Sequence, residues 1–137
     1  MNLSFHLKMI GALMLLLALG HIYFPKRFGW KEELGRLSLL NRQIFLVHCF
    51  FVCLVLCMFG VLSLVYTGTL TQPGPLARLV LGGLVIFWTA RLFIQFFVYD
   101  PRLWKGNRFN TAMHIFFSLM WVYYVAVYAA ALWQQYH

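Results

Sequence analysis

Four ionisable side chains lie within segments that otherwise consist almost entirely of apolar residues: His21, His48, Arg91 and His114. Such segments are typical of membrane spans. An ionisable group at membrane depth is energetically costly, so it is rare and usually has a function. Imidazole and guanidinium groups bind haem, metal ions and oxygen-bearing organic ligands, and each of these chemistries makes a different demand on spacing.

A b-type haem requires two imidazoles from different helices, with arginine to pair its propionates. His48 and His114 are the expected axial pair, and Arg42 or Arg91 would pair the propionates. A metal ion could instead take all three histidines, His21 included. Because the spans contain no Asp or Glu, a carboxylate-rich di-iron site is disfavoured.

A quinone-like ligand requires hydrogen-bond donors to its oxygens and aromatic walls, and the third apolar segment supplies both. Arg91 and Gln95 lie four residues apart, so they share a helix face with Trp88 and Tyr99. The fourth segment carries a similar stripe, formed by Thr111, His114, Ser118 and Trp121. Polar stripes of this kind normally face the interior of a helix bundle. The alternative is structural: the histidines join helices by hydrogen bonds. For Arg91 the expected partners are Gln95, Tyr99, helix-end carbonyls or an anionic ligand.

The composition indicates an integral membrane protein. Of 137 residues, 63% are hydrophobic and only 10% are charged, and the mean hydropathy is +0.78. A soluble domain averages about 25% charged residues. The formal charge of +8 is concentrated in two connecting loops. That distribution favours contact with anionic lipid headgroups over nucleic-acid binding.

The pattern predicts a single all-α domain over residues 1–137, a bundle of four transmembrane helices. The spans cover about residues 7–24, 42–66, 76–99 and 111–133, each close to the ~20 residues that cross a bilayer. We expect the first to be a retained span rather than a cleaved signal peptide. Pro25 is predicted to end it, and the turn at 72–75 lets Pro75 begin the third. Asp100-Pro101 and Gly106-Asn107 supply the remaining breaks.

Positive charges predict the orientation. The loop between the first two spans carries five positive charges: Lys26, Arg27, Lys31, Arg36 and Arg42. The loop between the last two spans carries three: Arg102, Lys105 and Arg108. The other side of the membrane has two, Lys8 and Arg78. Because cytoplasmic loops are enriched in Lys and Arg, both termini are predicted to be extracytoplasmic. All four opening residues would then lie in the cytoplasmic half of the bilayer.

Two further features complete the topology. Between residues 28 and 40, large apolar residues alternate with charged ones, which predicts a short interfacial helix in the first loop. Cys49, Cys53 and Cys57 share one apolar helix at four-residue intervals, where their separation does not suit a disulfide. They are expected to act as small packing residues.

The whole chain resembles a group of small four-span bacterial membrane proteins to which no function is assigned. The likeness is carried by segments 24–34 (FPKRFGWKEEL), 40–43 (LNRQ) and 91–106 (RLFIQFFVYDPRLWKG). It implies topology and a bacterial inner membrane, not an activity. In size and span number only, the chain is also similar to the ergosterol-biosynthesis scaffold family of the endoplasmic reticulum.

Two functions follow as expectations. The first is binding of a haem, a metal or a quinone-like ligand in the inner leaflet, in a role such as electron transfer, by His48, His114, Arg91, Gln95, His21 and Arg42. The second is a non-enzymatic scaffold or accessory subunit of a larger membrane complex, in which these residues join helices or subunits. No Ser-His-Asp set, phosphate loop, HExxH or CxxC motif is present, so an enzyme is disfavoured.

Overall fold

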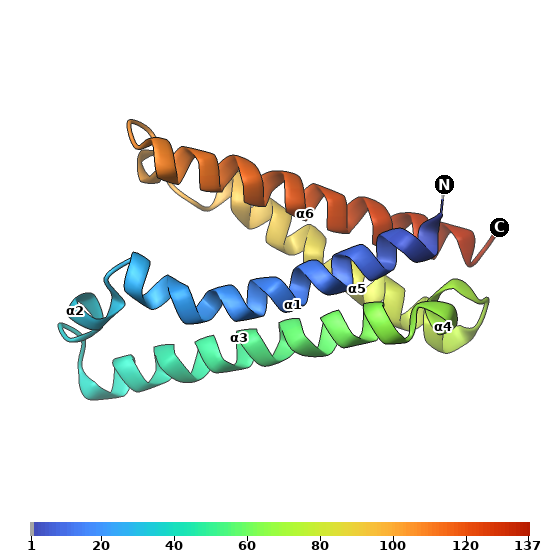
Figure 1. The fold of residues 1–137 in the computed structure, drawn as a ribbon, viewed down its shortest axis with the longest axis horizontal. Coiled ribbons are helices and arrows are strands. Elements are labelled where there is room, and N and C mark those ends of the chain that lie inside the picture. The colour runs from blue at the N-terminus through green and yellow to red at the C-terminus, as the bar shows by residue number, and fades with distance from the viewer. Residues whose placement is uncertain (1) are drawn as a thin grey trace. The chain divides into compact units, whose positions relative to one another are not determined.

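The computed structural model describes residues 2–137, and its described part is helical without strands. Four helices are long and apolar enough to cross a membrane: α1 (Leu3–Arg27), α3 (Leu39–Val65), α5 (Pro75–Phe97) and α6 (Arg108–Gln134). Three short helices lie between them: α2 (Trp30–Leu34), α4 (Thr67–Thr71) and the 3₁₀ turn η1 (Pro101–Leu103) (Figure 1). The all-helical prediction with four membrane-length helices is therefore confirmed.

The long helices run a few residues beyond most of the predicted span limits, and one predicted helix end, at Pro25, is contradicted. This residue lies inside α1, which continues to Arg27, so the expectation that Pro25 ends the first span is wrong. Proline lacks one backbone donor, which a helix near its end can lose without breaking. Gly29 follows with φ 66°, a left-handed conformation that glycine adopts at little cost, and it separates α1 from α2.

Two other boundaries have the expected local causes, whereas α5 ends at Phe97, before Asp100-Pro101. Pro75 occupies the first turn of α5, where its missing N–H has no helical partner to lose. Gly106 adopts φ 78°, and the Asn107 side chain caps α6 by accepting from the Asn110 N–H. A short helix does form in the first loop, although α2 covers only Trp30–Leu34 of the amphipathic stretch. The helix α4 was not expected, because four of its five residues are Thr or Gly, which favour helix only weakly.

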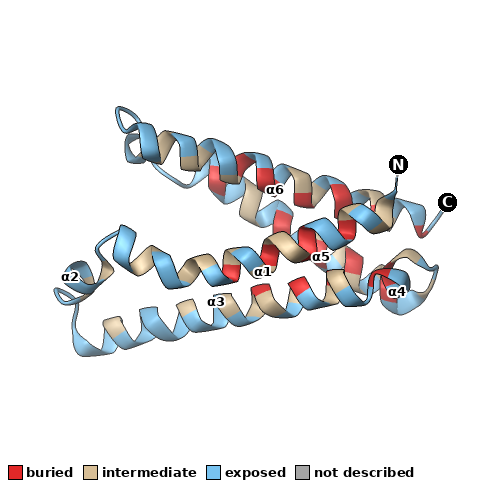
Figure 2. Ribbon diagram, viewed as in Figure 1, coloured by how far each residue is buried: buried red, intermediate tan, exposed pale blue. Residues whose placement is uncertain are grey.

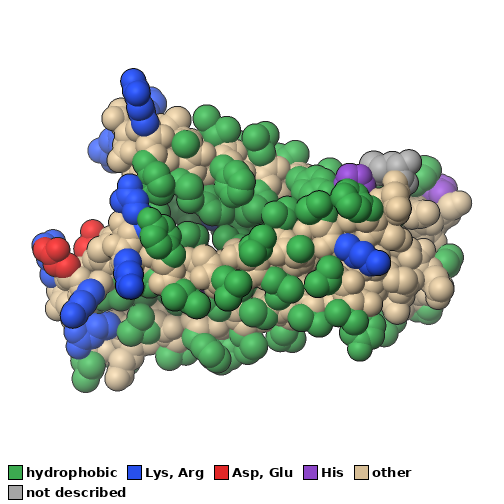
Figure 3. Space-filling model, viewed as in Figure 1, with side chains coloured by type: hydrophobic (Ala, Val, Ile, Leu, Met, Phe, Trp, Pro, Cys, Tyr) green, Lys and Arg blue, Asp and Glu red, His purple; other side chains and the backbone are tan. Residues whose placement is uncertain are grey.

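The chain divides into two compact units. The N-terminal unit is Leu7–Thr67, a pair of antiparallel helices formed by α1 and α3 with α2 in their connection. The C-terminal unit comprises Gly68–His137 together with residues 2–6, and α5 and α6 form its antiparallel pair. In both units most of the exposed Lys and Arg side chains gather at the connecting loop, around α2 and around η1, while Lys8 lies near the start of α1 (Figure 3).

Close backbone packing holds the N-terminal unit together. A Cβ added to Gly11 of α1 would lie 2.7 Å from the Gly60 carbonyl oxygen and 2.8 Å from the Leu64 nitrogen of α3. A Cβ on Gly60 would in turn lie 2.9 Å from Leu15 Cγ. Glycine at both contact positions lets the two helix backbones approach closely, which is a common solution for helices in lipid.

Large side chains hold the C-terminal unit together. Trp88 of α5 stacks on Trp121 of α6 with ring centroids 5.2 Å apart, and meets the edge of Tyr124 at 4.9 Å. Buried residues of α6 run from Ser118 to Ala131 (Figure 2).

The C-terminus of α6 is tied to the loop before α5 by the buried side chain of Gln135. Its amide donates to the carbonyls of Leu70 and Gln72, each at 2.8 Å, and accepts from the Gly74 N–H at 3.0 Å. Arg78 donates to the Gln135 carbonyl at 3.3 Å. This link at one end of the unit leaves the opposite end, near η1, as the place where polar side chains of α5 and α6 meet.

Candidate functional site

A polar network connects α5 and α6 near the η1 end of the C-terminal unit. Arg91 Nη1 donates to Gln95 Oε1 at 3.3 Å, and Gln95 Nε2 lies 3.0 Å from His114 Nδ1. Arg91 lies six residues before the end of α5 and His114 six residues after the start of α6. Each is therefore roughly 9 Å along its helix from the same end of the pair.

The hydrogen-bond roles in this network follow from what each group can donate. Arg91 has only donors, so the Gln95 oxygen must face it, and the Gln95 NH₂ group must then face His114. An NH₂ group cannot accept, so His114 Nδ1 carries no proton and Nε2 does. Arg91 thus fixes the orientation of Gln95, and Gln95 fixes the tautomer of His114.

Aromatic rings surround the network on both helices. The His114 ring stacks on Trp104 with centroids 3.8 Å apart and planes 13° from parallel. Thr111 holds Trp104 in place, because its hydroxyl donates to the Trp104 carbonyl at 2.5 Å. The Arg91 guanidinium lies 4.9 Å from the Trp121 ring centroid and 5.5 Å from that of Tyr99. The site is therefore a group of donors flanked by flat apolar faces.

The pairing of Arg91 with Gln95 and Tyr99 is confirmed, as is the shared face of these residues on α5. Gln95 is only 5% exposed. Sequence reasoning did not identify Trp104 as part of the site, since a tryptophan near the end of a span is usual at a membrane interface. Nothing in the residue spacing indicates that the loop after α5 places the Trp104 ring against His114.

The other three predicted site residues belong to the N-terminal unit. His21 Nδ1 lies 2.8 Å from the Leu17 carbonyl, and His48 Nδ1 lies 2.8 Å from the Ile44 carbonyl. Because a carbonyl only accepts, both rings carry the proton on Nδ1 and donate it to their own helix. Arg42 lies half-buried in the first turn of α3. The structure brings together Arg91, Gln95 and His114, while His21 and His48 each bond within their own helix.

The hydrogen bonds of the three histidines distinguish between the candidate ligands. A haem or metal ligand binds through an unprotonated nitrogen, often with the other nitrogen donating to a carbonyl. His21 and His48 have that pattern, with Nε2 left as the unprotonated nitrogen. His114 does not, because Gln95 occupies its unprotonated Nδ1. Among residues 2–137 no group of three or more His, Cys, Asp or Glu side chains is arranged to hold a metal ion.

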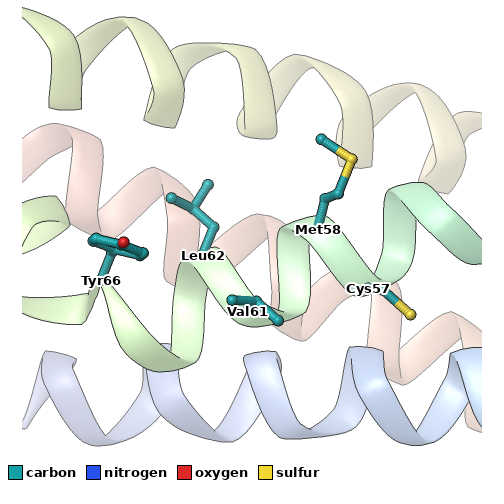
Figure 4. Close-up of a pocket in the computed structure, with 5 residues that line it drawn as sticks. All are labelled: Cys57, Met58, Val61, Leu62 and Tyr66. Atoms are coloured by element: carbon teal, nitrogen blue, oxygen red, sulfur yellow. The ribbon is translucent and has the colours of Figure 1, made fainter.

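The N-terminal unit contains a hollow of about 410 Å³ lined by apolar residues of α3 and the adjoining Tyr66. Cys57 and Met58 line it, but their side chains point in different directions and form no common pair of sulfur ligands (Figure 4). The hollow is mostly apolar, and the described residues that line it include no charged side chain or histidine to orient a ligand. The network of α5 and α6 is the better candidate site.

The fold and the site together define an all-helical protein with four membrane-length helices and a partly buried polar network between the last two. No protein-family model matches the chain, and neither a curated protein nor a solved structure shows significant similarity to it. The resemblance to small four-span bacterial proteins therefore stays a prediction, and function has to be argued from the network itself.

Proposed function

We propose that this chain is a small integral protein of a bacterial inner membrane that binds a quinone-like ligand at Arg91, Gln95 and His114. The observation that carries the proposal is the fixed tautomer of His114, which turns its Nε2–H into a hydrogen-bond donor with no partner among the described residues. A quinone carbonyl is an acceptor, and its flat ring suits the half-buried Trp104, whose ring lies beside the His114 donor. A ligand of this class would serve electron transfer.

The proposed topology has both termini outside the cytoplasm. Its support is the charge distribution, with Lys and Arg gathered in the two loops that carry α2 and η1. The bond between His6 Nδ1 and Tyr123 Oη, 2.6 Å long, supports placing the start of α1 and the second half of α6 on the same side. We place α2 at the inner interface, with Trp30 and Leu34 towards lipid.

A haem held by His48 and His114 is less well supported, because His114 would have to exchange its Gln95 bond for a metal bond. A metal site on the three histidines requires a closer grouping than the described residues provide. The quinone-like ligand requires no change in the hydrogen bonds present. It is therefore the member of this set that the geometry supports best.

One test separates these ligands. The protein, purified in mild detergent, is scanned for a Soret band, assayed for metal, extracted for lipid-soluble quinone, and titrated with a benzoquinone carrying a decyl chain. We expect a colourless, metal-free preparation whose tryptophan fluorescence is quenched saturably by the quinone. A Soret band that is lost in both His48→Ala and His114→Ala would instead establish the haem. Absence of saturable quenching would rule out the proposed ligand.

The second candidate is a non-enzymatic accessory subunit of a larger membrane complex. It is favoured by the same network, because Arg91, Gln95 and His114 already bond to one another and join two helices. In that case the chain extracted from its own membrane migrates in a larger assembly, and quinone neither binds nor is extracted with it. Native gel electrophoresis of the solubilised membrane checks this outcome.

A further inference from the structure

The positive charge of Arg91 has no carboxylate partner in the described chain. Its hydrogen-bond acceptor is the neutral amide oxygen of Gln95, and its other contacts are the rings of Tyr99 and Trp121. The ion pairs that the structure does contain, Arg36 with Glu32 and Arg102 with Asp100, lie in the loops. All three acidic residues of the chain lie outside the four long helices. An isolated cation in a low-dielectric span is unfavourable, and an anion beside it would remove that cost.

Hydrogen-bond donors also outnumber acceptors around this charge. The indole nitrogens of Trp88 and Trp121 and the hydroxyl of Tyr124 are buried without a partner in the described chain. The three residues are 2%, 4% and 0% exposed, and their rings contact one another, with Trp121 also beneath the Arg91 guanidinium. Buried donors in proteins are nearly always satisfied, by protein, water or ligand. Together with His114 Nε2–H, the two indole N–H groups are donors without an acceptor in the described chain, while the Tyr124 hydroxyl can donate or accept.

We infer that the site takes its ligand as an organic oxyanion, the enolate or phenolate form of an acidic quinone or phenol attached to an apolar chain. This inference rests on the proposed function and deepens it by naming the charge of the ligand. The ligand oxyanion pairs with Arg91, and its remaining oxygen accepts from His114 Nε2–H. A neutral quinone would satisfy His114 but leave the charge of Arg91 uncompensated.

The flat walls of the site distinguish this class from other anions. Trp104 stacks on His114 with one face and is only half-buried, so its other face can meet a ligand ring. Trp121 offers no such face, because Trp88 and Phe117 both stack on it. A conjugated ring gains stacking energy on such faces, whereas the head of a fatty acid does not. A delocalised oxyanion also suits a guanidinium, which binds planar oxygen pairs with two parallel hydrogen bonds.

The test compares two probes that differ by one acidic proton. The first is a hydroxynaphthoquinone with a long alkyl chain, which is ionised at neutral pH, and the second is its methyl ether, which cannot ionise. Each is titrated against the purified full-length protein in detergent, with saturable quenching of tryptophan fluorescence as the readout and protein-free micelles as the partition control. We expect the hydroxyl form to bind about tenfold more tightly or better, since charge-assisted bonds are roughly twice as strong as neutral ones.

Variants of Arg91 separate a charge effect from a structural one. Arg91→Gln should abolish the preference for the hydroxyl form over the ether, whatever it does to the affinity that the two probes share, while Arg91→Lys should retain part of the preference. Far-ultraviolet circular dichroism checks that the helices remain. His48→Gln is the matched control, since His48 bonds only within α3, and it should change neither affinity.

The outcomes of this experiment distinguish the inference from the proposed function. Equal affinities for the two probes, or a preference that survives in Arg91→Gln, would overturn the inference while leaving a neutral quinone as the ligand. Failure of both probes to quench saturably would remove the proposed function as well. If Arg91→Gln does not fold, Arg91→Lys decides the question. Partial retention of the preference for the hydroxyl form supports the inference, and complete loss of that preference overturns it.

Discussion

The two helix pairs of this chain are joined in opposite ways. In the N-terminal unit α1 and α3 meet at Gly11 and Gly60, where the two helix backbones approach each other closely. In the C-terminal unit α5 and α6 meet through stacked rings and a chain of hydrogen bonds from Arg91 to His114. The first arrangement leaves no space for a ligand between the contact glycines. The second leaves donors that the described chain does not use, which is the property expected of a binding site.

The histidines show the same difference. His21 and His48 each donate to the carbonyl four residues earlier, a bond that a single helix satisfies. His114 instead accepts from a residue of the neighbouring helix. Residue type and depth therefore do not define the function of an intramembrane histidine. The hydrogen bond on its second nitrogen decides whether it is a donor or an acceptor towards a ligand.

The largest effect should follow Gln95→Leu, which removes the link in the C-terminal unit. Arg91 then loses its acceptor and His114 loses its donor, and groups left unsatisfied in this way cost about 2–3 kcal/mol. Thermal unfolding in detergent, followed by helical circular dichroism, should show this loss. A variant as stable as the wild type would mean that the network contributes nothing to holding α5 on α6.

A second change at the same position sharpens the comparison. Gln95→Glu preserves the bond to Arg91 but replaces the donor facing His114 with an acceptor. The proton of the neutral ring should then move from Nε2 to Nδ1. Nitrogen-15 spectra of histidine-labelled protein report the two ring nitrogens separately, so the signals of His114 should exchange character while those of His21 and His48 stay the same. Unchanged His114 signals would contradict the assigned tautomer.

The next largest effect concerns ligand binding. His114→Ala removes the Nε2–H donor, and loss of one hydrogen bond of about 1.5 kcal/mol corresponds to roughly a tenfold weaker affinity for the quinone probe. His48→Ala removes only a bond within α3 and should leave the affinity unchanged. Saturable quenching of tryptophan fluorescence measures both. Equal losses of quinone affinity in the two variants would show that the different hydrogen bonds of His114 and His48 do not affect ligand binding.

A smaller effect is expected from the N-terminal unit. A methyl group at Gly11 would lie 2.7 Å from the Gly60 oxygen, so Gly11→Ala must push α1 away from α3 at a cost of about 1–2 kcal/mol. Gly83→Ala is the matched control, because no atom lies within 4 Å of its added methyl. Thermal unfolding should therefore show destabilisation at Gly11 only, with quinone affinity retained in both. Equal destabilisation by both substitutions would contradict the close contact at Gly11.

The sequence was sufficient to predict the helices because hydropathy and turn residues are local signals. The α5 stripe and the Arg91–Gln95 pair were predictable for the same reason, since residues four apart face one another on any helix. The partner of His114 was not predictable, because it depends on how α5 and α6 rotate against each other. The position of Trp104 depends on the path of the loop through η1 and on the Thr111 bond, and neither leaves a pattern in residue spacing. The end of α1 does not follow from Pro25, because a helix near its end can lose the backbone donor that proline lacks. The helix ends instead just before Gly29, which adopts a left-handed conformation.

The smallest expected effect lies in the loop next to the network. Asp100 caps η1 by accepting from the Arg102 N–H at 2.9 Å, and its side chain accepts from the Arg102 guanidinium at 2.7 Å. The Arg102 side chain, and then its backbone N–H, hold the pKa of the Asp100 carboxyl below its ordinary value. A lowered folded-state pKa means that the stabilisation is present above the ordinary aspartate pKa and is lost as the pH falls through the folded one. Asp100→Asn should therefore remove only a slight acid dependence of unfolding.

Because the pair of Asp100 and Arg102 is exposed to solvent, high salt should have the same effect on the wild type. An acid dependence that persists unchanged in Asp100→Asn would place the responsible group elsewhere in the chain.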